Sequence, residues 1–241
     1  MRDEKFDLYI FGSTSEIVQQ LISSQKAWFR ERTNHLYVMQ RGEHCPEVYR
    51  DFPHTAISLD CADAKGFAEA LRQITATHAQ GTRPLHVFPT YGKFSWNYAA
   101  KNPVFRFSDD GYQINLNSRL QIIEAFRPFA KRTRFHLMGS LFANFPYTGD
   151  YALSMWYINQ LPRNAEYADL HLNIYNIGGC KTRFWNHEAG PKNNPFLHDR
   201  IPTQEIFEHG FLGNQPGVFT FYPSAMSRVA CFLGSRGVRV L

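Results

Sequence analysis

Near its N-terminus the sequence reads Leu8-Tyr9-Ile10-Phe11-Gly12-Ser13-Thr14-Ser15-Glu16-Ile17, and this stretch decides the predicted fold. A short apolar run that ends at Gly12 is typical of a buried strand followed by a turn. The spacing from Ser13 to Glu16 fits a capping box, and apolar residues then recur at helical intervals as far as Trp28. We therefore predict a strand, a tight turn and a helix.

Short apolar runs continue to alternate with helical patterns along the chain. Further strands are predicted at residues 35–39, 55–59, 85–88, 134–138 and 172–176, and helices at 64–77, 112–130 and 151–161. Such alternation indicates a parallel sheet with helices on both faces. The predicted fold class is α/β, a Rossmann-like doubly wound parallel sheet in three layers, with residues 1–241 as a single domain. The carboxyl ends of its strands would meet at one edge, where such sheets bind ligands.

Residues 183–215 differ from the rest, because they are rich in Asn, Pro, His and Gly and show little periodicity. A loop of this length in a compact domain is typical of a functional lid or a mobile segment, so we predict a substrate lid or variable segment here. His187, His198 and His209 have no metal-ligand spacing, and no metal site is predicted. We expect aromatic side chains at the mouth of the crevice to form an apolar substrate wall: Phe94, Trp96, Phe184 and Trp185.

Composition excludes several classes of protein. The 241 residues carry a net charge of +5 from dispersed basic residues, which weakly favours phosphates or an acidic carrier protein as partners and does not indicate nucleic-acid binding. Four scattered cysteines form neither a disulfide framework nor a zinc pattern, so we expect a reducing, cytoplasmic location. No segment approaches the roughly 20 apolar residues of a membrane span, and no secretory signal is visible.

The turn at Gly12 offers a first candidate site. A helix that follows such a turn presents backbone N–H groups and a positive dipole end to a dinucleotide pyrophosphate. Only one of the three glycines of a dinucleotide fingerprint is present, because Glu16 and Val18 stand at the other two positions. A carboxylate at residue 16 would weaken phosphate binding unless it caps the helix. An ordinary capped helix after a strand is the alternative interpretation.

Five further segments follow in a recognisable order along the predicted elements: Asp60-Cys61-Ala62-Asp63, Pro89-Thr90-Tyr91-Gly92, Gln113-Ile114-Asn115-Leu116, Met138-Gly139-Ser140 and Ile177-Gly178-Gly179-Cys180-Lys181-Thr182. With the Gly12 turn, this order resembles the short-chain dehydrogenase/reductases from about Leu8 to Thr182. The resemblance implies that a dinucleotide is held by Gly12, Ser13, Thr14, Ser15, Ile17, Arg41, Asp60, Cys61, Thr90, Gly92, Gly178 and Thr182. It also implies a catalytic group made of Tyr151, Ser140 and Asn115.

The end of the second predicted strand bears on the choice of cofactor. An NAD enzyme needs a carboxylate there for the ribose 2′-OH, whereas NADP needs a cation for the 2′-phosphate. Gln40 occupies the acidic position of the family and Arg41 the basic one. The sequence therefore favours NADP(H), and a solvated surface role for Arg41 is the alternative.

The expected function is NADP(H)-dependent reduction of a carbonyl on a small molecule. In the family a Tyr donates the proton, a Ser holds the substrate oxygen, and a Lys one helical turn after the Tyr lowers its pKa. Tyr151 and Ser140 match, but Met155 stands at the Lys position. An unassisted phenol titrates near 10, so its ionisation at pH 7 costs roughly 4 kcal/mol. A neutral phenol is nevertheless the donor that the reductive direction requires.

Three interpretations of Met155 remain open. Lys93 or Lys181 supplies the missing charge; or the substrate is activated or tethered, for example to an acyl carrier protein, so that positioning lowers the barrier; or the protein is a catalytically degenerate relative that binds a cofactor or a regulatory partner. The resemblance also implies a homodimer or homotetramer formed through the helix of Tyr151, on which Trp156 and Tyr157 would point away from the crevice.

Overall fold

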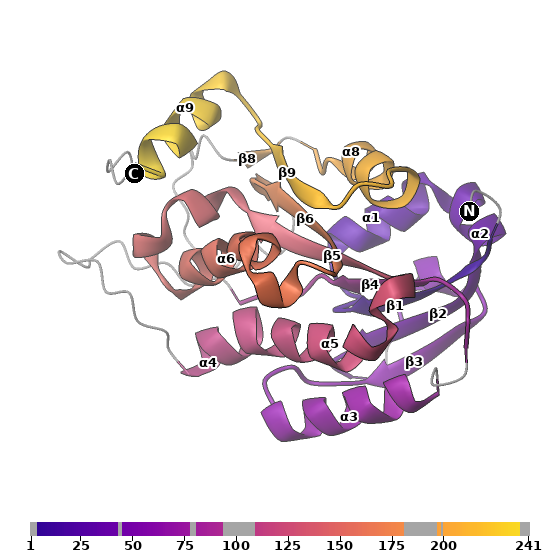
Figure 1. Cartoon of the computed structure of the whole chain (residues 1–241). Coiled ribbons are helices and arrows are strands. Elements are labelled where there is room, and N and C mark those ends of the chain that lie inside the picture. Colours follow the sequence, from indigo (N-terminus) through magenta and orange to yellow (C-terminus); the bar gives the residue numbers. More distant parts are fainter. Residues whose placement is uncertain are drawn as a thin grey trace.

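A computed structural model describes residues 4–42, 45–77, 81–93, 109–180, 197–198 and 200–236. Within these ranges seven parallel strands form one sheet with helices on both faces (Figure 1). The strands are β1 (Phe6–Phe11), β2 (Thr33–Gln40), β3 (His54–Ser58), β4 (Leu85–Pro89), β5 (Thr133–Ser140), β6 (His171–Ile177) and β9 (Gly217–Phe221). Their order, β3-β2-β1-β4-β5-β6-β9, confirms the predicted Rossmann-like α/β fold.

Three helices cover one face of the sheet, α3 (Ala64–Ala76), α5 (Ser118–Phe126) and α6 (Asp150–Gln160). The apolar residues of α3 recur at helical spacing and are buried, and Asp63 caps this helix by accepting a hydrogen bond from the Gly66 amide. The helix predicted at 112–130 consists of four successive elements: α4 (Asp109–Tyr112), the π-helical turn η2 (Gln113–Asn117), α5, and the 3-10 turn η3 (Arg127–Arg132), which is kinked at Phe129 (φ −108°).

The opposite face is covered by α1 (Glu16–Ser24), α2 (Lys26–Arg32), α8 (Thr203–Phe207) and the π-helical turn η8 (Glu208–Leu212) (Figure 1). The prediction of one helix through Trp28 was wrong, because the backbone leaves the helical region at Gln25 (φ −119°). The loop prediction was wrong for residues 203–212, where Ile206, Phe207 and Phe211 are buried on the sheet. Residues 183–196 and 199 of the predicted lid lie outside the described residues.

The remaining described elements are short or peripheral: β7 (Gly179–Cys180), β8 (Leu197–His198), α9 (Ala225–Gly234), and the 3-10 turns η1 (Glu47–Tyr49), η4 (Leu141–Asn144), η5 (Pro146–Thr148), η6 (Leu161–Arg163) and η7 (Ala165–Tyr167). No helix in the described part of the chain combines the length and apolar character needed to span a membrane.

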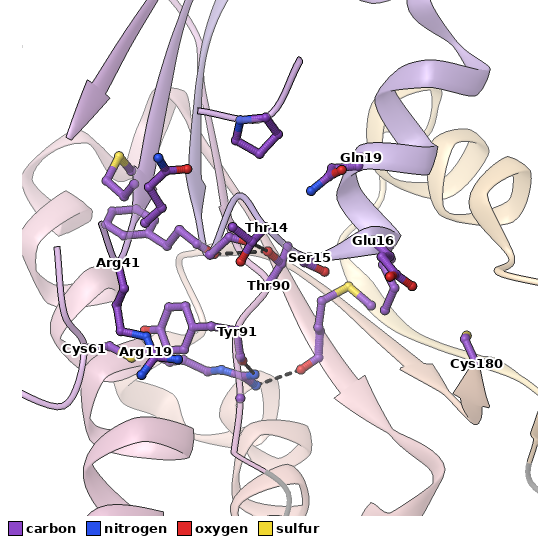
Figure 2. A pocket seen from close by; sticks show the side chains of 18 of the residues that line it. Thr14, Ser15, Glu16, Gln19, Arg41, Cys61, Thr90, Tyr91, Arg119 and Cys180 are labelled. Atoms are coloured by element: carbon purple, nitrogen blue, oxygen red, sulfur yellow. Dashed lines mark hydrogen bonds between the residues drawn. The ribbon is translucent and has the colours of Figure 1, made fainter. Parts of the chain in front are cut away.

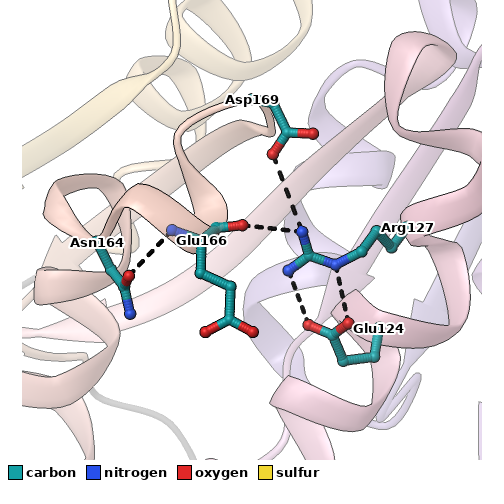
Figure 3. Close-up of polar contacts among 5 residues, drawn as sticks. All are labelled: Glu124, Arg127, Asn164, Glu166 and Asp169. Atoms are coloured by element: carbon teal, nitrogen blue, oxygen red, sulfur yellow. Dashed lines mark hydrogen bonds and ion pairs between the residues drawn. The ribbon is translucent and has the colours of Figure 1, made fainter.

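An ionic network holds the end of α5 against the segment that follows α6 (Figure 3). The Arg127 guanidinium donates two hydrogen bonds to the Glu124 carboxylate, at 2.8 and 2.9 Å, and a third to the Glu166 carbonyl oxygen at 2.8 Å. Asp169 lies 3.9 Å from the same guanidinium. The fork to Glu124 is bidentate but lies within one stretch of chain, whereas the contacts with Glu166 and Asp169 join the end of α5 to the segment that follows α6.

A buried polar chain crosses the sheet beneath η8. His86 Nδ1 lies 2.9 Å from His136 Nε2, and His136 Nδ1 lies 2.8 Å from the Tyr175 hydroxyl. His136 also stacks on Phe211 with ring centroids 4.6 Å apart. Burial lowers the pKa of His86 to about 3 and that of His136 well below its ordinary value. Both histidines are therefore neutral core residues at pH 7.

This burial predicts acid sensitivity. Unfolded histidines take up protons below about pH 6.5 while His86 and His136 stay neutral in the folded protein, so unfolding becomes easier as the pH falls towards 3. We expect the free energy of unfolding to decrease by on the order of 1 kcal/mol per pH unit for each histidine, measured by urea denaturation between pH 7 and pH 4. His86→Phe should reduce this slope, and an unchanged slope would contradict the assignment.

Candidate functional site

The chain leaves β1 through a turn that is held on both sides. Gly12 has a φ of +84°, and its amide donates a hydrogen bond to the Met39 carbonyl oxygen at 2.9 Å. A Cβ at this residue would lie 2.9 Å from the Cβ of Tyr91, which follows β4. Both the backbone conformation and the close approach therefore require glycine.

The capping box predicted for Ser13 and Glu16 does not form. Ser13 is buried, and its hydroxyl donates to Gln40 Oε1 at 2.6 Å on β2, while its carbonyl oxygen accepts from the Tyr49 hydroxyl at 2.8 Å. The helix begins two residues later than the motif requires, and Ser15 at its N-cap makes no side-chain capping bond. The first turn of α1 thus lacks a side-chain cap.

A cleft of about 870 Å³ lies at the carboxyl edge of the sheet (Figure 2). It is lined by eleven of the residues predicted for the site: Gly12, Thr14, Ser15, Ile17, Arg41, Cys61, Thr90, Gly92, Ser140, Tyr151 and Gly178. Ser13, Asp60 and Asn115 do not line it, and Thr182 lies outside the described residues. Asp60 is exposed, and its carboxylate accepts a hydrogen bond from the amide of Ala62 in its own turn.

One end of the cleft suits a phosphorylated nucleotide. The first turn of α1 opens into it, and Arg41 reaches it from the end of β2 (Figure 2). The Thr90 hydroxyl lies 2.8 Å from the Gly12 carbonyl oxygen and supports the turn. The buried Nε2 atom of Gln40 has no hydrogen-bond partner among the described residues. Glu16 also lines the cleft, and its negative charge would disfavour a phosphate there.

A phenol and a hydroxyl meet at the other end. Tyr151 stands in the first turn of α6, Ser140 ends β5, and their side chains are hydrogen-bonded. Ser140 Oγ also accepts from the Phe142 amide at 3.2 Å, which fixes the hydroxyl in place. Burial raises the pKa of Tyr151, while Arg119 and the Ser140 hydrogen bond oppose the rise. The phenol is therefore protonated at pH 7 and able to donate.

Asn115 holds the loop that follows β4. It is fully buried in the π-helical turn η2, its Nδ2 donates to the Lys93 carbonyl oxygen at 2.8 Å, and its Oδ1 accepts from the Lys93 amide at 2.7 Å. The Lys93 ammonium lies 3.1 Å from the Asp110 carboxylate, and the side chain is 54% exposed. Its charge is therefore directed to α4 and not to Tyr151. Lys181 lies outside the described residues.

Sequence reasoning missed Arg119. This side chain is 2% exposed, lines the cleft, and donates to the carbonyl oxygens of Met138 at 2.7 Å and Tyr91 at 2.6 Å (Figure 2). Its guanidinium also lies over the Tyr91 ring, 5.8 Å from the centroid. The available signal was its position one helical turn after Asn115, on the same face of the predicted helix.

The other polar groups near the cleft do not form a second reactive centre. Burial raises the pKa of Cys180 to about 12 and also raises that of Cys61, so both thiols are neutral and poorly nucleophilic at pH 7. Among the described residues, no cluster of three or more His, Cys, Asp or Glu side chains could hold a metal ion. Trp156 and Tyr157 are exposed and do not line the cleft, and the predicted aromatic wall lies outside the described residues.

Comparison with known proteins gives similarity of structure alone. The sequence matches no protein-family model and no curated protein. Among solved structures, a short-chain dehydrogenase/reductase from Serratia marcescens is 14% identical, with a TM-score of 0.63 over 92% of this chain and 98% of that one. ElxO with NADP bound is 15% identical, with a TM-score of 0.67 over 92% and 99%. A short-chain dehydrogenase from Burkholderia cenocepacia, in complex with NADP, is 16% identical, with a TM-score of 0.66 over 98% and 95%. The chain shares their fold.

The Gly12 turn can be tested against a matched glycine. Gly42 also has a φ of +84°, but nothing lies within 4 Å of the position of its Cβ. We expect Gly42→Ala to cost about 1 kcal/mol from backbone strain, and Gly12→Ala to cost at least about 2 kcal/mol because strain and a backbone clash combine. Urea denaturation of the two variants measures the difference. Equal losses would show that the contact with Tyr91 is relieved without cost.

Proposed function

We propose that this protein is an NADP(H)-dependent oxidoreductase that reduces a carbonyl group, with Tyr151 as the proton donor. The observation that carries the proposal is the single cleft that joins the Gly12 turn to the hydrogen-bonded pair of Tyr151 and Ser140. The shared fold with structures described as NADP-bound supports the choice of cofactor.

The described residues fit this cofactor in two respects. Gly12 allows the closest approach of backbone to ligand, and the first turn of α1 supplies N–H groups without a side-chain cap for the pyrophosphate. Arg41, exposed at the end of β2, would bind the 2′-phosphate. When bound, the reduced nicotinamide supplies a hydride equivalent. Thr90, Gly92 and Gly178 also line the cleft.

The protein contributes the proton. Ser140 Oγ, fixed by the Phe142 amide, would hold the substrate carbonyl oxygen. Tyr151 then donates its phenolic proton to that oxygen as negative charge develops on it, which leaves a phenolate on the enzyme. Asn115 keeps the loop at Lys93 in place through its paired hydrogen bonds, and we assign it a positioning role in ordering water near the phenol.

The substrate we propose is a small carbonyl compound, with a carrier-tethered acyl group as one candidate. The net charge of +5 suits docking of an acidic acyl carrier protein. The second candidate function is a cofactor-binding or regulatory protein without turnover. Glu16 in the cleft and Met155 one turn after Tyr151 favour this alternative, because one opposes phosphate and the other is uncharged.

Replacement of the phenol separates the two functions. We expect Tyr151→Phe to reduce NADPH-dependent turnover of a carbonyl panel by about a hundredfold or more, since the proton donor is removed. Binding of NADPH, followed by its fluorescence, should be retained. Tyr147→Phe, on the preceding turn and away from the cleft, is the control and should keep its activity. Retained NADPH binding without turnover in the natural chain would favour the binding protein.

The assignment of Arg41 predicts a change in cofactor preference. Arg41→Asp should weaken NADPH binding at least about tenfold, because a charge-assisted hydrogen bond is lost and a repulsion is gained. Binding of NADH should be unchanged or tighter. Fluorescence titration with both nucleotides measures the ratio of affinities. Arg50→Asp, at an exposed arginine outside the cleft, should leave that ratio unchanged. An unaltered ratio in Arg41→Asp would contradict the proposed phosphate contact.

A further inference from the structure

Arg119 is a buried cation whose place in the fold calls for an explanation. Burial of a guanidinium costs several kcal/mol unless an anion compensates it. Among the described residues no carboxylate pairs with Arg119, and its Nε atom is buried without a hydrogen-bond partner. The groups near it that could become negatively charged are weak acids: the phenols of Tyr91 and Tyr151 and the thiol of Cys61. The charge therefore acts on acids that are neutral at pH 7.

The guanidinium is held rigidly and close to Tyr151. Its two terminal nitrogens donate to the carbonyl oxygens of Met138, on β5, and Tyr91, after β4. A Cβ placed on Gly92 would lie 3.8 Å from Arg119 Nη2 and 3.6 Å from Tyr151 Cε2. Guanidinium and phenol ring thus converge on one point at the wall of the cleft, and a glycine leaves the space between them free of a side chain.

Met155 explains why the cation comes from α5. Its side chain is fully buried, and its Sδ atom lies 3.8 Å from Arg119 Nη1. A lysine at residue 155 would therefore bring a second buried cation against the first. We therefore interpret Met155 and Arg119 together: the uncharged Met155 leaves room beside Tyr151 for the buried cation of Arg119.

We propose that Arg119 is the positioning cation of this site, which takes the role that a lysine one turn after Tyr151 would otherwise have and stabilises the phenolate left on Tyr151 after proton transfer. The role rests on the proposed function; the placement of the charge beside the phenol does not. Burial and Cys180 raise the pKa of Tyr151, while Arg119 and the hydrogen bond from Ser140 lower it. The phenol stays protonated before the reaction, and its conjugate base is the form that Arg119 favours.

The direct test measures the phenol in the protein without cofactor. Residue 151 alone is replaced by 3,5-difluorotyrosine, whose more acidic phenol can be titrated by fluorine NMR while the protein remains folded. We expect Arg119→Met to raise the pKa of this phenol by about one unit or more, because a nearby opposite charge is lost. Arg72→Met, at an exposed arginine on α3 that does not line the cleft, should leave it unchanged. An unchanged pKa in folded Arg119→Met would overturn the proposal.

A charge-relocation cycle tests the same proposal by turnover and stability. Arg119→Met should lower kcat more than it raises KM, and Arg119→Lys should retain part of the activity. Adding Met155→Lys to Arg119→Met should restore kcat and lower the pKa of residue 151, because one cation again faces the phenol. Met155→Lys in the natural chain should lower the melting temperature and not raise kcat. Higher turnover in that single variant would show that no cation had been present, and would sink the proposal even if Arg119→Met failed to fold.

The two readouts keep this inference separate from the proposed function. If no carbonyl compound is reduced but the NMR titration shifts in Arg119→Met, Arg119 still acts on Tyr151 and the reductase assignment fails. If turnover depends on Tyr151 but the titration does not shift, the reductase assignment holds and the role of Arg119 is lost.

Discussion

The close contact between Gly12 and the backbone of Tyr91 is the constraint on which the site depends. β1 lies between β2 and β4, so the strand order reverses here, and the helices α1 and α5 cover opposite faces of the sheet. The crevice of a doubly wound sheet opens at this reversal. The same Tyr91 backbone accepts the hydrogen bond of Arg119. The turn that shapes the Gly12 end of the cleft therefore also helps to place the cation at the phenol end.

The electrostatics of the cleft follow from burial. Loss of solvent raises the pKa of Tyr151 and of both cysteines that line the cleft, so all three side chains are neutral at pH 7. Arg119 is charged in the same environment, held by carbonyl oxygens and an aromatic face. A buried cation of this kind is not expected to stabilise the fold, because apolar residues would fill the same space without the desolvation penalty of a charge. Its location beside a polar cleft is typical of a functional site.

Local patterns were misleading where long-range contacts compete with them. Ser13 and Glu16 have the spacing of a capping box, yet burial of Ser13 against β2 gives its hydroxyl a better-shielded partner in Gln40. Residues 203–212 resemble a loop by composition. Their backbone nevertheless forms short helices, because their few large apolar side chains pack on the sheet. β9 is an edge strand that is only partly buried, so its pattern is weak. In each case the decisive partner lies far away in the sequence.

The sequence by itself determined the alternation of six strands with helices and the tight turn at Gly12, because hydrophobic period and turn chemistry are local properties. The grouping of Tyr151 with Ser140 was implied by the resemblance to a known family and does not follow from these local patterns. It also determined that no lysine follows Tyr151 by one helical turn. Only the tertiary structure decided which cation faces the phenol. Lys93 and Arg119 each lie within four residues of a predicted site residue in the sequence. In the structure Lys93 is exposed and pairs with Asp110, whereas Arg119 is buried and donates a hydrogen bond to the Tyr91 carbonyl oxygen. The field at a buried group depends on distances across helices and strands, and those distances exist only after the chain has packed.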